Sequence, residues 1–165
     1  MERILVIGCP GSGKSTFSRK LNKIINIPLY HLDMMYWNKD KTTVEKTVFY
    51  ENLDKVLQSD KWIIDGNYQS SMEQRIKRCD TIIFLDYSVD VCLEGIKERR
   101  GKERSDIPWV SHEDDLNFIE LIKNYNTNNK PIVLDLLKKY SNKDIYVFSN
   151  RDESEKFLNL LQNNS

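Results

Sequence analysis

The sequence has few of the residues that would mark a disulfide-rich or metal-binding protein. Its 165 residues include three cysteines, two histidines, four prolines and six glycines. Cys9, Cys79 and Cys92 share no C-x-x-C or metal-ligand spacing, so a disulfide framework and a zinc site are both disfavoured. Scattered cysteines of this kind indicate reduced thiols, and we therefore expect a cytoplasmic protein.

Long apolar runs and net charge are also missing. No run approaches the ~20 apolar residues that a membrane-spanning helix needs, which excludes that class. The 25 Lys and Arg residues balance the 25 Asp and Glu residues. No overall field therefore attracts nucleic acid or an anionic membrane, and direct DNA binding is not expected. The length and the 39% apolar content predict one globular domain spanning residues 1–165.

Three of the six glycines gather in one loop. Residues 8–15 read G-C-P-G-S-G-K-S, which matches the phosphate-binding pattern G-x-x-x-x-G-K-[ST], the Walker A motif. Residues 4–7 before it are apolar and rich in β-branched side chains, as in a buried parallel strand. Phe17, Leu21 and Ile24 after it recur at helical spacing. A strand, this loop and a helix, in that order, form the context that supports nucleotide binding.

The residue types of this loop suit a triphosphate with magnesium. Glycines without Cβ atoms let backbone N–H groups surround a phosphate, and the positive end of the following helix points at the same anion. Lys14 is expected to reach the β- and γ-phosphates, and the Ser15 hydroxyl to bind Mg²⁺. The predicted ATP-binding residues are Gly8, Pro10, Gly11, Ser12, Gly13, Lys14, Ser15 and Thr16.

Short apolar segments alternate with helical patterns along the chain, which predicts an α/β fold with a parallel sheet covered on both faces. Val48, Ile132 and Leu160 are among the side chains expected to pack on the core, and residues 34–41 are expected to form an exposed loop. The predicted strands are residues 4–7, 27–33, 62–65, 81–86 and 145–148. The predicted helices follow the phosphate loop, span residues 43–59 and 70–78, and begin at Ser88, a capping box at 111–114, Pro131 and Asn150.

Acidic residues follow three of the predicted strands. Asp33, Asp65 and Asp86 each come directly after an apolar run, at the sheet edge where parallel sheets bind ligands. Asp65 is preferred as the acid that supports Mg²⁺, because the turn at Gly66 brings the backbone close to a ligand, and Asp86 is the alternative. Asp33 is a candidate for orienting or deprotonating an acceptor hydroxyl. It could equally bind a ribose or a base, or cap the loop.

A basic cluster follows the predicted helix that begins at Ser88. Such charges neutralise a transferring phosphoryl group, and Gly101 is a candidate hinge for a short lid over residues 99–110. The alternative is a solvated helix end, where the helix dipole favours cations. Arg75 and Arg78 are further candidates for binding a phosphate of the acceptor. The cluster consists of Arg99, Arg100, Lys102 and Arg104.

Four segments together resemble a known family. They are G-C-P-G-S-G-K-S-T at 8–16, I-P-L-Y-H-L-D at 27–33, W-I-I-D-G-N-Y at 62–68 and D-T-I-I-F-L-D at 80–86. These segments are similar to the bacterial DNA topology modulation proteins, which are related to adenylate kinase. The resemblance implies a three-layer P-loop NTPase fold of the nucleoside/nucleotide kinase type, with a five-stranded parallel sheet in the order 2-3-1-4-5.

A looser similarity to adenylate kinase extends to single residues. Asp65 falls at the acid of its D-G-F-P-R segment, which supports Mg²⁺, and Asp33 falls at the acid of its T-G-D-M acceptor segment. Arg99 and Arg100 fall at the arginine pair that opens its lid, which implies catalytic roles for both. The residues after the D-G pair and at the acceptor arginine differ, and the lid is shorter, so AMP is not assigned as the acceptor.

These patterns predict a kinase that uses ATP and Mg²⁺ to phosphorylate a small-molecule acceptor, with a nucleotide or nucleoside as one candidate. The alternative is a nucleotide-binding regulator with weak ATPase activity that affects DNA topology without a small acceptor. A GTPase is disfavoured, because the guanine-reading N-K-x-D pattern is missing. The sequence leaves monomer and dimer open. The predicted catalytic residues are Lys14, Asp33, Arg99 and Arg100, and the predicted metal ligands are Ser15 and Asp65.

Overall fold

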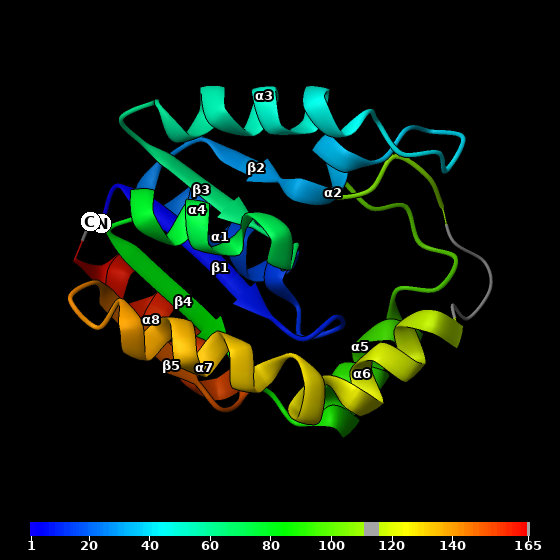
Figure 1. Ribbon diagram of the computed structural model, residues 1–165. Helices are drawn as coiled ribbons and strands as arrows, with labels where there is room; N and C mark the ends of the chain where they lie inside the picture. The colour runs from blue at the N-terminus through cyan, green and yellow to red at the C-terminus, as the bar shows by residue number, and fades with distance from the viewer. Residues whose placement is uncertain (111–115, 165) are drawn as a thin grey trace.

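The centre of the molecule is a five-stranded sheet in which all neighbouring strands are parallel. The computed structural model describes residues 1–110 and 116–164. The strand order is β2-β3-β1-β4-β5, which confirms the predicted order (Figure 1). The strands are β1 (Arg3–Gly8), β2 (Leu29–His31), β3 (Trp62–Asp65), β4 (Thr81–Leu85) and β5 (Asp144–Phe148).

Helices cover both faces of this sheet (Figure 1). α3, α4 and α7 supply residues to the core on one face, and α1, α5, α6 and α8 supply the core on the other. None of the helices over the described ranges is long and apolar enough to cross a membrane. The helices are α1 (Lys14–Ile25), α2 (Leu32–Tyr36), α3 (Lys46–Leu57), α4 (Gln69–Arg78), α5 (Val89–Glu98), α6 (Leu116–Asn128), α7 (Lys130–Lys139) and α8 (Arg151–Asn163).

The central strand β1 is buried on both faces of the sheet, which explains why its sequence is a continuous apolar run. Successive side chains of a strand point to opposite faces of the sheet. Ile4 and Val6 lie in the core beneath α1 and α8, whereas Leu5 and Ile7 lie in the core beneath α3 and α4. Both faces of β1 are therefore buried over residues 4–7, where a polar side chain would be removed from water without a partner.

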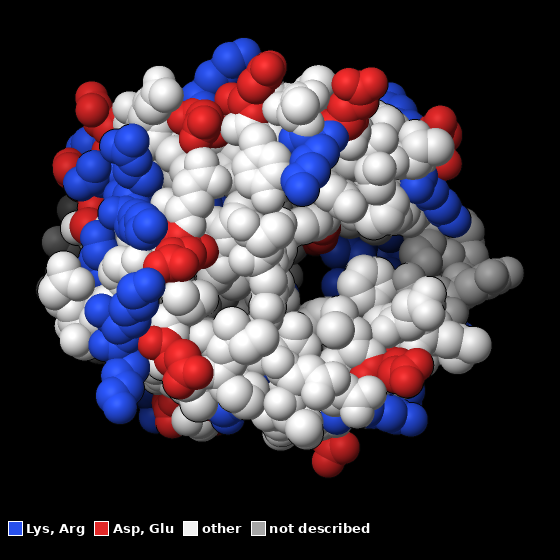
Figure 2. Space-filling view, viewed as in Figure 1, with Lys and Arg blue, Asp and Glu red and all other residues white. Residues whose placement is uncertain are grey.

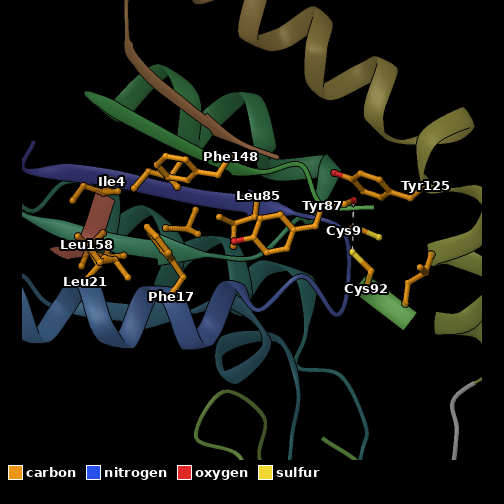
Figure 3. Packing of buried hydrophobic residues seen from close by; sticks show 14 of the residues in the cluster. Ile4, Cys9, Phe17, Leu21, Leu85, Tyr87, Cys92, Tyr125, Phe148 and Leu158 are labelled. Atoms are coloured by element: carbon orange, nitrogen blue, oxygen red, sulfur yellow. Dashed lines mark hydrogen bonds between the residues drawn. The ribbon is translucent and has the colours of Figure 1, made fainter. Parts of the chain in front are cut away.

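The core beneath α1 and α8 reaches as far as the phosphate loop. Phe17 of α1 lies 6.2 Å from Phe148 of the sheet between ring centroids, and Figure 3 shows Leu158 of α8 beside Leu21 of α1 in the same core. At the other end of the same core, Cys9 of the loop and Cys92 of α5 are both buried. Packing of the core thus fixes the base of the loop, and this is what positions the site.

The second predicted strand is wrong in its last part. β2 includes only Leu29–His31, and the chain turns into α2 where a strand end and an exposed loop were expected. Leu32 is fully buried, and a Cβ added at Gly66 would meet the Leu32 Cβ at 2.9 Å. A short apolar run fits a buried strand or a helix, and this close packing favours the helix. Asp33 therefore lies in α2 and not at the end of a strand.

The apolar stripes of three helices are narrower than predicted. Val48, Ile132 and Leu160 were expected to face the core, but they are 42%, 46% and 62% exposed. Each helix packs one row of side chains against the sheet, such as Phe49 in α3. The side chains at neighbouring positions point away from the sheet. α3 also begins at Lys46, later than predicted.

Two predicted helix starts are confirmed by their caps. The Ser88 hydroxyl accepts the Val91 N–H at 3.3 Å, and the Asn150 side chain accepts the Glu153 N–H at 3.0 Å. Each side chain satisfies a backbone donor that the first turn of a helix leaves unpaired. The capping box predicted at residues 111–114 lies outside the described residues.

Candidate active site

The phosphate loop connects the end of β1 to the first turn of α1. Within it the Ser12 N–H donates to the Cys9 carbonyl at 3.1 Å. Gly11 has a φ of +82°, and an added Cβ would lie 2.0 Å from the Cys92 carbonyl of α5. Packing against α5 thus requires glycine at this position, and the room that it leaves for a ligand stays a prediction. A Cβ at Gly13 would meet nothing within 4 Å, which leaves that side of the loop open.

Lys14 lies among the charged groups of this region. Its ammonium donates to the carbonyls of Gly8 at 2.9 Å and Cys9 at 3.1 Å. Burial lowers the pKa of Lys14, and the carboxylates of Asp65 and Asp33 act in the opposite direction. The phosphate loop and two of the predicted acids are therefore close enough to form one site.

The Ser15 hydroxyl faces an acid that the sequence analysis missed. Ser15 Oγ donates to Asp106 Oδ2 at 2.7 Å, and Arg104 Nε donates to Asp106 Oδ1 at 3.0 Å. Burial opposes ionisation of Asp106, but the Arg104 guanidinium and the Ser15 hydroxyl hold its pKa at about 2. Asp106 follows no strand and belongs to no motif. Its place inside the predicted lid is the one sequence signal that could have indicated it.

The two acids considered for magnesium have different partners. Asp65 is 4% exposed, and its Oδ2 lies 2.7 Å from His31 Nδ1 of the neighbouring strand. Asp86 forms an ion pair with Lys130 of α7 at 2.8 Å. Asp65 lies close enough to Lys14 of the phosphate loop to raise the pKa of the lysine, whereas the carboxylate of Asp86 is paired with a cation of another helix. This arrangement favours Asp65 over Asp86, and its role with magnesium stays a prediction.

Asp33 is held by a phenol from the turn after β3. The Tyr68 hydroxyl donates to Asp33 Oδ1 at 2.6 Å, and the Tyr36 ring packs beside Tyr68 with 4.8 Å between ring centroids. Burial raises the pKa of Asp33, against the opposing effects of Tyr68 and Lys14. A desolvated carboxylate beside a lysine of the phosphate loop has the chemistry to orient an acceptor hydroxyl or to accept its proton.

Arg75 and Arg78 do not take the positions expected of groups that bind the acceptor. Arg75 is fully buried, and its guanidinium donates to the carbonyls of Gly66 and Tyr68. Arg78 is exposed and ends α4, just before the chain enters β4. Since the strands are parallel, the start of β4 lies at the opposite end of the sheet from the phosphate loop. The prediction for both arginines was wrong.

The segment after α5 lies against the helix that follows the phosphate loop. α5 ends at Glu98. Arg99 is half-buried and close enough to Lys14 to lower the pKa of the lysine, while Arg100 is exposed. Further along, the Ser105 hydroxyl accepts from Arg19 Nη1 of α1 at 3.0 Å. This contact and the Asp106 contact bring the segment onto α1.

The same segment reaches the side of the site where Asp33 lies. Trp109 packs edge-on against Trp37, with 5.5 Å between ring centroids. Figure 1 shows the chain crossing from α5 toward α2, and Figure 2 shows the surface hollowed beside it, with Lys and Arg atoms at the depth of the opening. The predicted lid therefore borders both the phosphate loop and α2.

The chain is similar to known kinases in sequence and in fold. A shikimate kinase from Clostridium botulinum is 29% identical over 132 residues, which are 73% of this chain and 77% of that protein. The structure of shikimate kinase from Acinetobacter baumannii in complex with shikimate matches with a TM-score of 0.59 at 17% identity, over 100% of this chain and 95% of that one. The fold is that of the shikimate kinases.

A second shikimate kinase supports the same conclusion about the fold. The enzyme from Bacteroides thetaiotaomicron matches with a TM-score of 0.55 at 20% identity, over 98% of this chain and 96% of that one. No protein-family profile matches the chain. The shikimate kinase fold confirms the predicted α/β P-loop class, whereas the likeness to DNA topology modulation proteins and the adenylate kinase type of specificity stay predictions.

Proposed function

We propose that this protein is a kinase that transfers the γ-phosphoryl group of ATP to a hydroxyl of a small molecule. One observation carries the proposal: Asp33, a half-buried carboxylate held by the Tyr68 hydroxyl, lies near enough to Lys14 for each group to shift the pKa of the other. A group suited to hold phosphate and a group suited to orient a hydroxyl thus share one site, as direct phosphoryl transfer requires.

The proposed ATP site is the loop of residues 8–16. Lys14 donates to two loop carbonyls, and with ATP bound its ammonium would contact the β- and γ-phosphates instead. Ser12 Oγ is buried and has no hydrogen-bond partner among the described residues. Because a buried hydroxyl without a partner is unfavourable, Ser12 is well suited to donate to a phosphate oxygen.

Magnesium fits the donor set beside Ser15. Mg²⁺ takes oxygen ligands in proteins, and here a hydroxyl lies 2.7 Å from the Asp106 carboxylate, with Asp65 near Lys14. We propose Ser15 and Asp65 as the residues that hold the ion, with Asp106 as a further carboxylate in its surroundings. When bound, the ion neutralises charge on the phosphates.

The proposed lid is the segment over residues 99–110. Arg99 and Arg100 at its start would stabilise charge on the transferred group. Closure of the segment over the phosphate loop would exclude water, which otherwise competes with the acceptor. The contacts of Asp106 with Ser15 and of Trp109 with Trp37 support this role, because they connect the segment to both sides of the site.

The acceptor can be identified by measuring ADP release with a panel of compounds. Shikimate is the first to test, because the relatives are named for it, and nucleosides and nucleotides follow from the sequence. We expect one compound to stimulate ADP release, with an equal amount of phosphorylated product detected by mass spectrometry. The same slow hydrolysis with every compound would contradict a kinase and favour the regulator with weak ATPase activity.

Lys14→Ala provides the decisive variant for this assay. Without the ammonium, phosphoryl transfer should fall at least about 100-fold, because one charged contact to the developing transition state is lost. The fold should persist, since burial of Lys14 lowers its pKa and the charge is therefore not favourable for folding. Lys20→Ala on the exposed side of α1 is the matched control and should keep full activity. Native turnover by Lys14→Ala in folded protein would refute the proposed site.

A further inference from the structure

The turn after β3 touches both halves of the proposed active site. Asn67 Oδ1 accepts the N–H of Gly8 in the phosphate loop at 3.3 Å. The hydroxyl of Tyr68, the next residue, donates to Asp33 Oδ1 at 2.6 Å. A displacement of this short segment would therefore change the position of the group proposed to orient the acceptor, and the two contacts depend on one backbone conformation.

That backbone conformation is not one that the chain adopts by itself. Gly66 has a φ of +131° and Tyr68 has a φ of 25°. A positive φ in a residue other than glycine is strained and persists only when the surroundings hold it. The backbone carbonyls of Gly66, Asn67 and Tyr68 also converge on one point, which would be unfavourable without a hydrogen-bond donor between them.

Arg75 of α4 supplies that donor. Its side chain is fully buried, Nη1 donates to the Gly66 carbonyl at 2.8 Å, and Nη2 donates to the carbonyls of Asn67 and Tyr68. Nε donates to Ser71 Oγ at 3.2 Å. Burial lowers the pKa of Arg75 to about 9, so the group is charged at neutral pH. One planar cation thus binds the whole turn.

We propose that Arg75 is a positioning residue that holds the Tyr68 hydroxyl against Asp33 and so fixes the carboxylate that orients the acceptor. The inference rests on the proposed function, in which Asp33 performs that role. Arg75 is too deeply buried to touch the acceptor or ATP itself. Its effect on the reaction therefore passes through the turn and Tyr68.

The shape of the guanidinium is what this position requires. Its fixed fork of N–H groups reaches several acceptors in one plane, whereas lysine places one compact ammonium on a flexible stem. Arg75→Lys keeps a cationic group but lacks the planar fork that reaches the three carbonyls and Ser71 from fixed positions. The variant therefore separates the geometry of the turn from the electrostatic effect of a buried cation.

The first test is a double-mutant cycle with Arg75→Lys and Tyr68→Phe. In acceptor phosphorylation we expect each single variant to lower kcat about tenfold, with a smaller effect on KM for ATP, because the orienting carboxylate is loosened and the phosphate loop remains. The double variant should lose no more than the worse single variant, since both act through the same hydrogen bond. Losses that multiply would overturn the inference.

Arg78→Lys is the matched control. It makes the same substitution one turn further along α4, at an exposed residue, and should leave kcat unchanged. Should Arg75→Lys fail to fold in thermal unfolding, Ser71→Ala replaces it. That variant removes one acceptor of the guanidinium and should change kcat in the same direction by a smaller factor. Native kcat in folded Arg75→Lys, or in folded Ser71→Ala where Arg75→Lys does not fold, would contradict the inference.

The second test does not depend on any activity. The groups that act on Asp33 are the hydroxyl of Tyr68, the ammonium of Lys14 and the carboxylates of Asp106 and Asp65. Tyr68 stabilises the ionised form of Asp33, so loss of its hydrogen bond should raise the pKa of that carboxyl further. A pH titration of the Asp33 carboxyl by ¹³C NMR, in the unliganded protein, measures this directly.

The expected result is an upward shift of the Asp33 titration in both Tyr68→Phe and Arg75→Lys, with none in Arg78→Lys. A shift in Tyr68→Phe alone would show that Arg75 does not hold the phenol, and would overturn the inference whether or not an acceptor is found. If the shifts occur as expected but no compound in the panel is phosphorylated, the proposed function fails while the positioning of Tyr68 by Arg75 stands.

Discussion

The chemistry of single residues in this site depends on how each carboxylate is paired. Asp33 accepts from the neutral Tyr68 phenol, whereas Asp106 accepts from a guanidinium and a hydroxyl. Burial therefore raises the pKa of Asp33, while Arg104 and Ser15 hold that of Asp106 at about 2 despite its burial. Groups whose pKa values are pushed apart in one site often have separate roles. A carboxylate with a raised pKa, such as Asp33, is suited to accept a proton from the acceptor hydroxyl. A carboxylate that stays ionised near neutral pH, such as Asp106, is suited to hold the predicted lid through an ionic contact.

The role of Asp33 is tested by Asp33→Asn. The amide keeps the shape but cannot accept a proton, so we expect acceptor phosphorylation to fall about 100-fold. The affinity for magnesium–ATP, measured by calorimetry, should change little. Asp40→Asn, at an exposed acid further along the same connection, is the control and should leave both quantities at the native value. An unchanged rate in Asp33→Asn would exclude Asp33 from the reaction.

The raised pKa of Asp33 also predicts a pH dependence. The ionised form is the active one, so the rate should decline as the pH falls through this pKa, above the ~3.9 of an ordinary aspartate. For an acid whose pKa is raised by folding, the folded protein binds the proton more tightly than the unfolded chain. The contribution of Asp33 to stability therefore increases as the pH falls. A pH–rate profile with its acidic limb at or below the ordinary value would contradict this assignment.

At the scale of elements, the segment after α5 differs from the rest of the site in how it is held. β1, β3 and β4 are fixed by ladders of backbone hydrogen bonds. Residues 104–109 belong to no strand or helix, and side chains such as those of Ser105, Asp106 and Trp109 attach them to other elements. Segments held in this way open at a small fraction of the free energy of global unfolding. This is what a lid over a binding site needs.

Asp106→Asn tests the attachment of this segment. Hydrogen bonds to a charged group contribute about 1.5–3 kcal/mol, so their weakening should make tryptic cleavage within residues 99–104 roughly tenfold faster. The folded-state pKa of Asp106 is about 2, below that of the unfolded chain. The contact therefore stabilises the protein above pH ~4 and is lost as the pH falls toward 2.

Glu103→Gln is the matched control for this experiment. Glu103 is an exposed acid in the same segment, so its neutralisation should leave the rate of cleavage at the native value. Equal cleavage rates for Asp106→Asn and the native protein would show that the carboxylate does not hold the segment down.

Elements also show where prediction from the sequence fails. The strands β1, β3 and β4 were predicted to within one or two residues, because their apolar runs are buried on both faces. α2 was missed, because the conformation of residues 32–36 depends on the packing of Leu32 against Gly66. These two residues are far apart in the sequence, so no local pattern contains that information.

At the scale of the whole molecule, ligand binding should stabilise the fold as a unit. The proposed nucleotide site combines β1, α1 and the segment after α5, and a ligand held by all three binds only the folded state. At 100 times its dissociation constant, magnesium–ATP would add about 2.7 kcal/mol to the free energy of unfolding. Thermal unfolding with and without magnesium–ATP measures this quantity.

Two comparisons make that measurement specific. Removal of magnesium by a chelator should reduce the stabilisation, because the ion offsets the charge of the phosphates. Lys14→Ala should reduce it as well, whereas Lys20→Ala should not. No upward shift of the melting temperature with magnesium–ATP, in protein known to be folded, would mean that the loop does not bind nucleotide.

The sequence by itself determined the sheet, its order through a family resemblance, and the phosphate loop, because apolar runs and glycine spacing are local patterns. Only the tertiary structure decided that Asp106 faces Ser15, that Tyr68 holds Asp33 and that Arg75 binds a turn instead of a ligand. Such pairings join residues that lie far apart in the chain or on different elements. Their partners are fixed by how the elements pack, and the spacing of residues along the chain does not encode that.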